Sequence, residues 1–327
     1  MKKQLLLALF ALCIPWSAWA DVEIDGIYYN LITKTKQAEV TNGGTTGRYS
    51  GNIVIPSSVE YEGVTYSVTT IYNEAFKDCS SLTGITIPNS VSSVGDFSFS
   101  NNDALSSVTI PNSVTRMGDF VFRDCDGLRS VTIGDGVSSI GAFVFESCNY
   151  LNMVTIGNSV TSIGNGAFYW CNNLTSVTMG SSVKNIGSSA FYGCYRLKSI
   201  NIPSSVKTIG RDAFNCSGYT TSLESVNIED IYAWCNIEFD DFYSNPLNIA
   251  HRLYLNGMEV TDLVIPDGVT SIGAYAFYKC TSLSSVNIPD GVTNIGDNAF
   301  YGCSSLISVN IPYGITQICA NTFYSCI

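Results

Sequence analysis

Apolar residues return along the chain at a fixed interval of 23 residues. The clearest marker is a leucine at one register position, or its Val260 counterpart, found in these places: Leu82, Leu105, Leu128, Leu151, Leu174, Leu197, Leu223, Val260, Leu283 and Leu306. After each marker, apolar and polar residues alternate, as in Val154-Thr155-Ile156, which predicts a short strand. A second apolar pair, such as Val160 and Ile163, indicates another short strand in the same period.

The rest of each period predicts how one copy turns into the next. The segment 165–171, "NGAFYWC", is expected to form a short helical turn with Ala167 and Phe168 facing inward, after a bend permitted by Gly164. One coil cannot bury its own apolar edge, so copies are expected to stack about 4.8 Å apart. The period and the L-x-x-V-x-I pattern are typical of a leucine-rich-repeat solenoid. We therefore predict about eleven coils, with short parallel strands stacked into a sheet and short helical turns on the other side.

The fuller phrase A-F-x-x-C-x-x-L-x-x-V-x-I-P resembles the BspA-like leucine-rich-repeat family of bacterial surface proteins. The resemblance covers roughly residues 50–327. It implies an exported, surface-associated protein of a kind often linked to adhesion to host or matrix proteins. It brings no shared catalytic residues with it.

Residues 1–20 are typical of a signal peptide. Lys2 and Lys3 precede the apolar run "LLLALFALCIPW", and small residues at Ala18 and Ala20 suit cleavage before Asp21. No later stretch is long and apolar enough to predict a membrane helix. The sequence thus predicts a secreted or cell-surface protein with no membrane insertion after signal removal.

Two segments depart from the repeat. Residues 21–49 are expected to form a capping hairpin over the first coil, because a solenoid end otherwise exposes core and strand edge. The solenoid itself is expected over residues 50–327, with an insertion at 229–259 that contains a hairpin turning at Asn256-Gly257. A further protruding hairpin is expected to turn at Gly63.

The charge limits the possible partners. The net charge is −11, and removal of residues 1–20, with two lysines and no acids, makes it more negative. Phosphate backbones and anionic lipid surfaces would repel such a chain. Nucleic acid is therefore excluded as an expected partner, and an extracellular protein or glycan is favoured.

Twelve cysteines in an exported chain raise the question of disulfides. Eight of them share one repeat position: Cys79, Cys125, Cys148, Cys171, Cys194, Cys280, Cys303 and Cys326. Asn102 takes that position in its own coil. Cysteines in neighbouring coils would be within disulfide range but would point in parallel into the core. We predict a buried, reduced ladder.

Catalytic and metal-binding patterns are weak. The one histidine, His251, lies in the insertion without a nucleophile motif, and Asp240 and Asp241 are interpreted as solvated loop acids. Asp124 and Asp126 faintly resemble a calcium loop, but the remaining ligands of such a loop are missing. We predict no catalytic residue, no cofactor and no metal.

Aromatic residues that follow the inward phenylalanine give the best candidate binding site, because Tyr and Trp often anchor interfaces. The candidates are Tyr169, Trp170, Tyr192, Tyr195, Tyr278 and Tyr301. Alternatively, these rings stack on each other and only shield the core. Trp234 and Phe239 in the insertion are a further possible platform, although packing onto the host coils is favoured.

Three functions remain after these exclusions. The first is a non-catalytic adhesion or binding module that holds a protein or glycan on its repeat surface. The second is a structural spacer or self-associating surface protein. The third, and least supported, is a hydrolase built on the insertion and dependent on His251.

Overall fold

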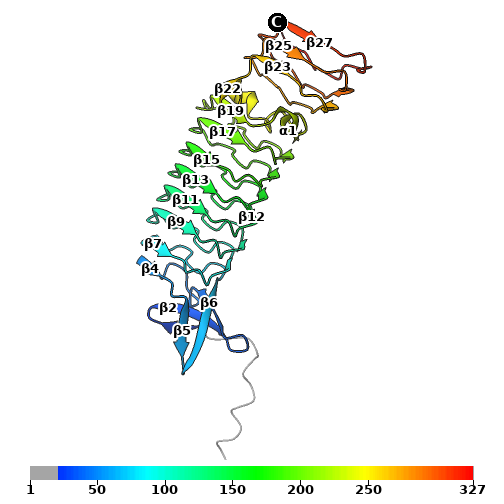
Figure 1. Ribbon diagram of the computed structural model, residues 1–327. Coiled ribbons are helices and arrows are strands. Elements are labelled where there is room, and N and C mark those ends of the chain that lie inside the picture. Colours follow the sequence, from blue (N-terminus) through cyan, green and yellow to red (C-terminus); the bar gives the residue numbers. More distant parts are fainter. Residues whose placement is uncertain (1–20, 327) are drawn as a thin grey trace, which may run out of the picture.

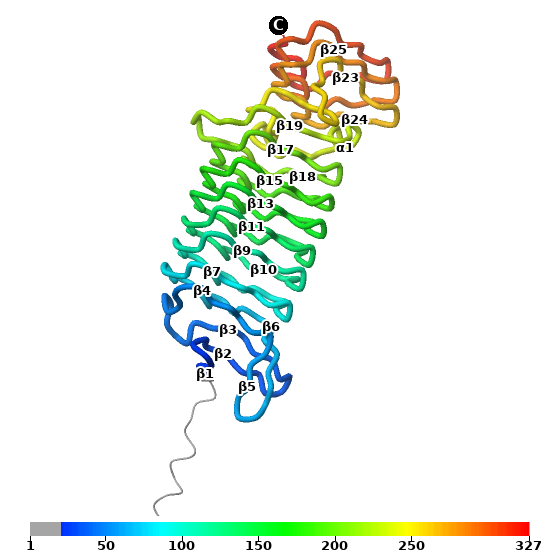
Figure 2. The backbone as a smooth tube through the Cα atoms, turned by 60° about the vertical axis from the view of Figure 1, so that its left-hand side comes forward, coloured from blue at the N-terminus to red at the C-terminus, as the bar shows by residue number. Residues whose placement is uncertain are grey.

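The computed structural model describes residues 21–326, so the predicted signal peptide at 1–20 lies outside the described residues. The chain winds into an elongated stack of coils, with the N-terminal strands at one end and the last coils at the other (Figures 1 and 2). The predicted solenoid is confirmed: each regular coil adds one short strand to each of two columns.

The strands of the first column carry the alternating motif. They are β4 (Gly51–Val54), β7 (Leu82–Thr86), β9 (Ser107–Ile110), β11 (Ser130–Ile133), β13 (Met153–Ile156), β15 (Ser176–Thr178), β17 (Ser199–Ile202), β19 (Ser225–Ile228), β21 (Leu253–Leu255), β23 (Asp262–Val264), β25 (Ser285–Asn287) and β27 (Ser308–Asn310). Pairing is parallel and in register, so Val131 lies between Val108 and Val154. Hydroxyl side chains such as Thr132 point outward, as the alternation predicts.

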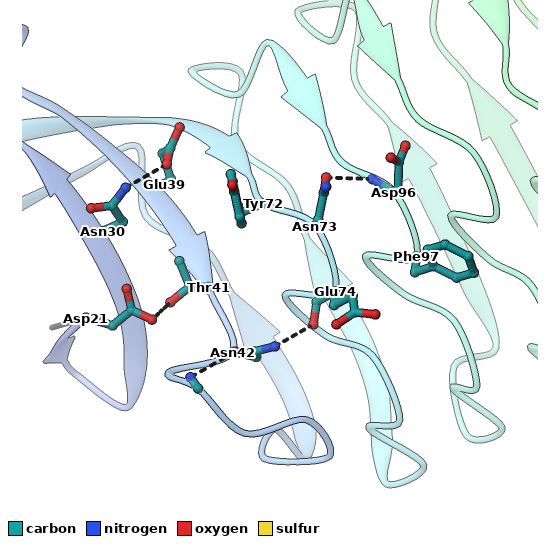
Figure 3. Close-up of a pocket in the computed structure, with 11 residues that line it drawn as sticks. Asp21, Asn30, Glu39, Thr41, Asn42, Tyr72, Asn73, Glu74, Asp96 and Phe97 are labelled. Atoms are coloured by element: carbon teal, nitrogen blue, oxygen red, sulfur yellow. Dashed lines mark hydrogen bonds between the residues drawn. The ribbon is translucent and has the colours of Figure 1, made fainter. Parts of the chain in front are cut away.

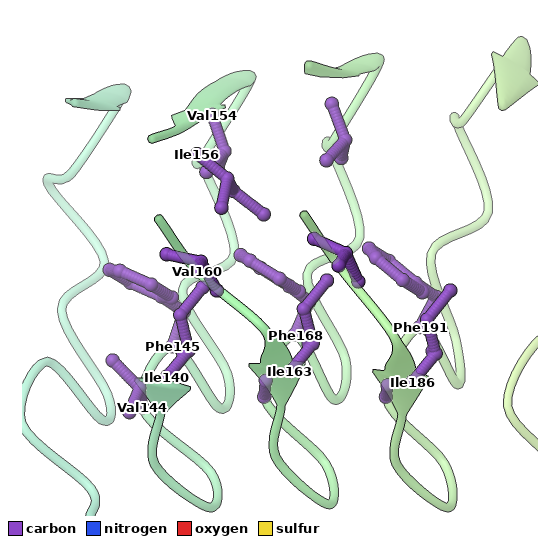
Figure 4. Close-up of a cluster of buried hydrophobic side chains, with 14 of the residues drawn as sticks. Ile140, Val144, Phe145, Val154, Ile156, Val160, Ile163, Phe168, Ile186 and Phe191 are labelled. Carbon is purple, nitrogen blue, oxygen red and sulfur yellow. The ribbon is translucent and has the colours of Figure 1, made fainter. Parts of the chain in front are cut away.

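The second column is built from two-residue strands that end each time in an inward Ile, Val, Met or Phe. They are β8 (Ser93–Val94), β10 (Arg116–Met117), β12 (Ser139–Ile140), β14 (Ser162–Ile163), β16 (Asn185–Ile186), β18 (Thr208–Ile209), β20 (Glu238–Phe239), β24 (Ser271–Ile272) and β26 (Asn294–Ile295). Between the columns, inward phenylalanines stack coil upon coil. The centroids of Phe145 and Phe168 are 5.3 Å apart, and those of Phe168 and Phe191 are 5.1 Å apart (Figure 4).

The prediction of a helical turn around Ala167 and Phe168 is wrong. This segment is a run of turns in which alternate residues donate backbone hydrogen bonds to the next coil, as Phe168 N does to Ala190 O (2.8 Å). The neighbouring coil gives every second N–H a partner, and the intervening N–H groups make single i→i−3 turn bonds, as Tyr169 N does to Gly166 O (2.9 Å), so no continuous helix forms. The described helices are α1 (Ile231–Cys235) and α2 (Leu247–Ala250), both in the insertion.

The structural reason for glycine at position 164 also differs from the predicted one, which was a bend in the chain. Its φ is not in the left-handed region, but a Cβ at this position would overlap the backbone of Gly141 in the preceding coil. The repeated glycine is therefore needed for the close approach of successive coils rather than for a bend.

The N-terminal segment contains three antiparallel strands rather than a simple hairpin: β1 (Val22–Ile24), β2 (Ile27–Ile32) and β3 (Gln37–Thr41). β3 then pairs in parallel with β6 (Val64–Ile71), which leads into the second column through β8. β5 (Ser58–Tyr61) and β6 form the protruding hairpin that turns at Glu62-Gly63. These strands cover the first coil of the stack.

The insertion is packed into the core. Trp234 is buried, and its indole N–H donates to the Ala276 carbonyl (2.8 Å) while its ring meets that of Phe239 edge to face. The favoured packing interpretation of these two aromatics therefore holds. β21 and β22 (Met258–Glu259) form the hairpin that turns at Asn256-Gly257, where both residues have positive φ.

The predicted burial of the cysteine ladder is confirmed for residues 21–326, whereas its reduced state stays a prediction. All eleven cysteines there are free thiols, and nine of them are buried. In the middle of the ladder the thiols bond to backbone rather than to each other: Cys148 Sγ donates to Phe122 O, and Cys171 Sγ to Phe145 O, each at 3.0 Å. The ladder is bonded to the backbone of the preceding coil.

Candidate functional site

Four of the six predicted site residues gather into one cluster. Tyr169 and Tyr192 stack with ring centroids 4.9 Å apart, because they occupy the same position in neighbouring coils. Trp170 meets Tyr169 and Tyr195 edge to face at 6.1 and 5.6 Å. All four rings are partly exposed.

Tyr278 and Tyr301 belong to a different cluster beyond the insertion. Tyr278 stacks between Phe242 (5.7 Å) and Tyr301 (4.9 Å), and Tyr301 continues onto Tyr324 (5.3 Å). Tyr278 is itself buried. The predicted site is thus divided in two by residues 229–259.

The first cluster extends further than predicted. On its N-terminal side, Phe97, Phe120 and Phe143 stack at 4.7 and 5.3 Å, and Phe143 contacts Tyr169. On its other side, Tyr219 meets Tyr195 edge to face at 5.3 Å. We call this continuous set the aromatic strip: Phe97, Phe120, Phe143, Tyr169, Trp170, Tyr192, Tyr195 and Tyr219.

Rings at the same repeat position stack face to face within the strip, so ring edges are more open to a partner than ring faces. Tyr192 contacts Ser217 through its hydroxyl. The Tyr195 hydroxyl is buried without a hydrogen-bond partner among the described residues, and burial raises the pKa of Tyr195 to about 12. Tyr195 therefore stays neutral at physiological pH. Tyr219, at 63% exposure, is the most open ring of the strip.

Strip residues also adopt a costly backbone conformation. Phe97, Phe120, Phe143 and Trp170 all have φ between 54° and 58°. Left-handed backbone is uncommon for bulky side chains and costs on the order of 1–3 kcal/mol. At the position of Trp170, other coils carry small or polar residues: Asp78, Asn101, Asp124, Ser147, Gly193, Cys216, Lys279, Gly302 and Ser325.

A groove that the sequence did not indicate lies where the cap meets the first coils (Figure 3). It has a volume of about 660 Å³ and lies at the carboxyl ends of the parallel strands β3, β6 and β8. Tyr72 and Asn73 follow β6 and occupy its middle, between Thr41 and Asp96 (Figure 3). Phe97, the first ring of the aromatic strip, also lines it.

Comparison with known proteins identifies the family. The sequence model described as "BspA type Leucine rich repeat region (6 copies)" matches residues 57–171, 138–244 and 247–327. The chain belongs to the BspA-type leucine-rich repeat family. Among curated proteins, no match to this BspA-type chain was found.

Two solved structures of bacterial proteins are similar to this chain. A leucine-rich cell surface protein from Faecalibacterium prausnitzii A2-165 is 27% identical, with a TM-score of 0.53, over 95% of this chain and 81% of that one. A leucine-rich repeat protein from Bacteroides ovatus ATCC 8483 is 24% identical, with a TM-score of 0.46, over 94% of this chain and 92% of that one.

The weaker catalytic candidates of this BspA-type protein have structural partners. His251 is half-buried, with Nδ1 3.2 Å from the Lys279 carbonyl, and burial lowers the pKa of its imidazole. Asp240 Oδ2 accepts from Arg211 N, and Asp241 Oδ1 accepts from Ser244 N. These contacts order loops and do not assemble a nucleophile with a base.

The two acids that resemble part of a calcium loop, Asp124 and Asp126, each interact with a neighbouring side chain or backbone group. Asp124 pairs with Arg123 (3.2 Å), and Asp126 accepts hydrogen bonds from the backbone and side chain of Asn149. Within residues 21–326, no group of three or more His, Cys, Asp or Glu side chains is arranged to hold a metal ion. Over the same residues, no helix has the length and apolar character needed to cross a membrane.

Proposed function

We propose that this BspA-type protein is an exported, non-catalytic binding module of the bacterial cell surface. In this proposal the aromatic strip holds an extracellular protein or glycan. The family supports surface association, and so does the relative from Faecalibacterium prausnitzii, which is described as a cell surface protein. The acidic net charge of −11 supports a partner other than nucleic acid.

The observation that carries the proposal is the backbone of Trp170. A bulky indole with φ 58° replaces the small or polar residues that other coils place there. Gly193 and Gly302 occupy the same repeat position and adopt positive φ at little cost. The backbone strain at Trp170 therefore suggests that its side chain has a function. Partly exposed Trp and Tyr side chains are well suited to anchoring a partner.

The test is Trp170→Gly, examined in a binding screen against immobilised matrix proteins and glycans. Relief of left-handed strain and loss of two edge-to-face contacts offset each other, so we expect stability to change by no more than about 1 kcal/mol. Binding is expected to fall at least tenfold. Changing Tyr169, Trp170 and Tyr192 together to Ser should abolish it.

Tyr150→Ser is the control, because Tyr150 is 54% exposed but lies outside the strip. It should bind like the wild type. If the triple variant loses several degrees of melting temperature and still binds with wild-type affinity, the strip only shields the core and the proposal fails.

Self-association is the second candidate function. Ile307 is 90% exposed, and Ile311 and Tyr313 are also exposed. Neighbouring exposed apolar side chains are suited to contact with a second copy. Sedimentation velocity over a range of concentrations tests this: a constant sedimentation coefficient contradicts it, and an increase that Ile307→Lys removes supports it.

A further inference from the structure

The groove between cap and solenoid is a second candidate site, distinct from the centre of the aromatic strip. Its volume of about 660 Å³ falls within the range of about 300–1,000 Å³ that is usual for small-ligand pockets. Parallel strands β3, β6 and β8 end there together, so the side chains of Asn42, Asn73 and Asp96 come from rigid positions. Asn30, Glu39 and Thr41 lie on strands, whereas Asn42, Asn73 and Asp96 lie in the turns that directly follow strands.

Three carboxylates of the groove each accept a hydrogen bond at one oxygen and leave the second oxygen available to a ligand. Glu39 Oε2 accepts from Asn30 Nδ2 (2.8 Å), Asp21 Oδ2 from Thr41 Oγ1 (2.7 Å), and Asp96 Oδ1 from Asp119 N (2.9 Å). Among the described residues, the second oxygen of each of these carboxylates makes no hydrogen bond.

Asn73 is also held by one hydrogen bond, but the atom that it leaves available to a ligand is a donor instead of an acceptor. Its Oδ1 accepts from Asp96 N (2.9 Å), which leaves the two N–H donors of Nδ2 without a partner in the described chain. The groove therefore presents fixed donors next to fixed acceptors. Sugar hydroxyls need this mixture, because each one donates and accepts.

The exposed ring of Tyr72 and the negative charge of the groove limit the class of ligand further. Tyr72 is half exposed in the middle of the groove, where its ring can pack against the C–H face of a sugar. Four carboxylates (Asp21, Glu39, Glu74 and Asp96) line the groove without any lysine or arginine; cleavage before Asp21, as predicted, would add one α-ammonium, and the nearby Lys77 is paired with Glu74 (2.7 Å). Anionic glycans would be repelled.

We propose that this groove binds a neutral glycan, which adds a second site to the proposed binding function. A cationic peptide is the competing ligand, since carboxylates and an aromatic ring would also suit a lysine or arginine side chain. A lysine or arginine side chain only donates, however, so it would pair with the carboxylates and leave the exposed Asn73 donors to water or a peptide carbonyl. The matched donor and acceptor pair at Asn73 and Asp96 therefore favours the glycan.

Asn73→Asp separates the two ligands by the direction of its effect. The substitution keeps the Oδ1 acceptor for Asp96 N, removes the open donors and adds a negative charge. On an array of neutral oligosaccharides with sulfated and sialylated counterparts and lysine-rich peptides, we expect neutral binding to fall at least tenfold. Binding of a cationic ligand would instead rise.

Asn165→Asp is the matched control. Asn165 occupies the same repeat position four coils later, and its Oδ1 accepts from Ser188 N at 2.9 Å, but it lies outside the groove. It should leave glycan binding unchanged, whereas Tyr72→Ala should weaken it like Asn73→Asp.

Three results would overturn the groove proposal: no neutral glycan bound, stronger peptide binding in Asn73→Asp, or equal loss in Asn165→Asp. Its failure is distinguishable from failure of the strip. If Trp170→Gly abolishes binding while Asn73→Asp does not, the proposed function stands and the groove is not a glycan site.

Discussion

The ring of Tyr169 meets the ring of Phe143 edge to face, with the centroids 6.2 Å apart and the planes at 76°. The two residues do not occupy the same repeat position. Gly166 stands in the coil after Phe143 where another phenylalanine would continue the stack, and the strip passes instead to Tyr169. A single glycine thus moves the aromatic strip from one column of side chains to another.

Gly166→Ala should disturb this junction. A Cβ there would overlap the ring of Phe143, and the residue has φ 59°, which alanine adopts only at a cost. We expect a loss of about 1–3 kcal/mol in the free energy of unfolding, measured by urea denaturation.

Gly63→Ala is its control, since Gly63 has φ 75° but nothing within 4 Å of the position of a Cβ. It should show only the backbone cost of about 1 kcal/mol. Equal losses in the two variants would show that the contact with Phe143 contributes nothing.

Phe191 tests the inward ladder. It is 1% exposed and stacks on both Phe168 and Phe214. Phe191→Ala should therefore cost about 3–5 kcal/mol in chemical denaturation. Asn201 is exposed on β17, so Asn201→Ala should cost about 0.5 kcal/mol or less. Similar values for the two would mean that the inward face is misassigned.

The sequence was sufficient to predict the coil but not its backbone hydrogen bonds. Alternation such as Val154-Thr155-Ile156 determines which side chains are buried, and the 23-residue spacing determines that copies stack. The Ala-Phe segment was misinterpreted as helical because a short apolar turn has the same local pattern in either structure. Alternate N–H groups of the segment donate to carbonyls 22 residues later, in the next coil, which the local pattern does not reveal.

Asn102 is a defect in the cysteine ladder that a substitution should repair. It is fully buried, and neither Nδ2 nor Oδ1 has a partner in the described chain. Asn102→Cys would allow a thiol to donate to Phe76 O, as Cys125 does to Phe99 O at 3.0 Å. We expect a gain of about 1–3 kcal/mol in the free energy of unfolding under reducing conditions.

The exposed neighbour Asn101 is the comparison, because Asn101→Cys adds a thiol without relieving a buried amide. It should not stabilise the protein. An unchanged denaturation midpoint for Asn102→Cys would show that the Asn102 amide is hydrogen-bonded in solution.

The buried cysteine ladder also predicts that the folded state loses stability at alkaline pH. Burial raises the pKa of Cys125 from 9.0 to about 12 and that of Cys280 to about 11. Because the pKa is higher in the folded state, the stabilisation is complete below about pH 9 and is lost as pH rises toward 11–12. The melting temperature should fall steadily from pH 9 to 10.5, and Cys125→Ala should reduce that slope.

Thiol titration checks the same ladder independently. Ellman's reagent at pH 8 should find few reactive thiols in the native protein and most of the eleven after denaturation without reductant. Release of one thiol or none on denaturation would show that disulfides join the coils in solution.

The candidate site was only partly predictable. Tyr169, Trp170, Tyr192 and Tyr195 were found from their place after the inward phenylalanine. Phe97, Phe120 and Phe143 were overlooked, although each stands two residues before an inward phenylalanine, a signal that the sequence contains. The groove had no such signal, because residues from 21 to 97 meet there only through the pairing of β3 with β6 and β8.

Because regular coils such as those of β9, β11, β13 and β15 join through the same in-register bonds, the length of this part of the protein changes in steps of one repeat. Adding or deleting one 23-residue unit, such as residues 151–173, would lengthen or shorten the molecule by about 4.8 Å. Both ends would keep their own structure. A gene that gains or loses repeats can therefore set how far the N-terminal groove stands from the opposite end without redesigning either.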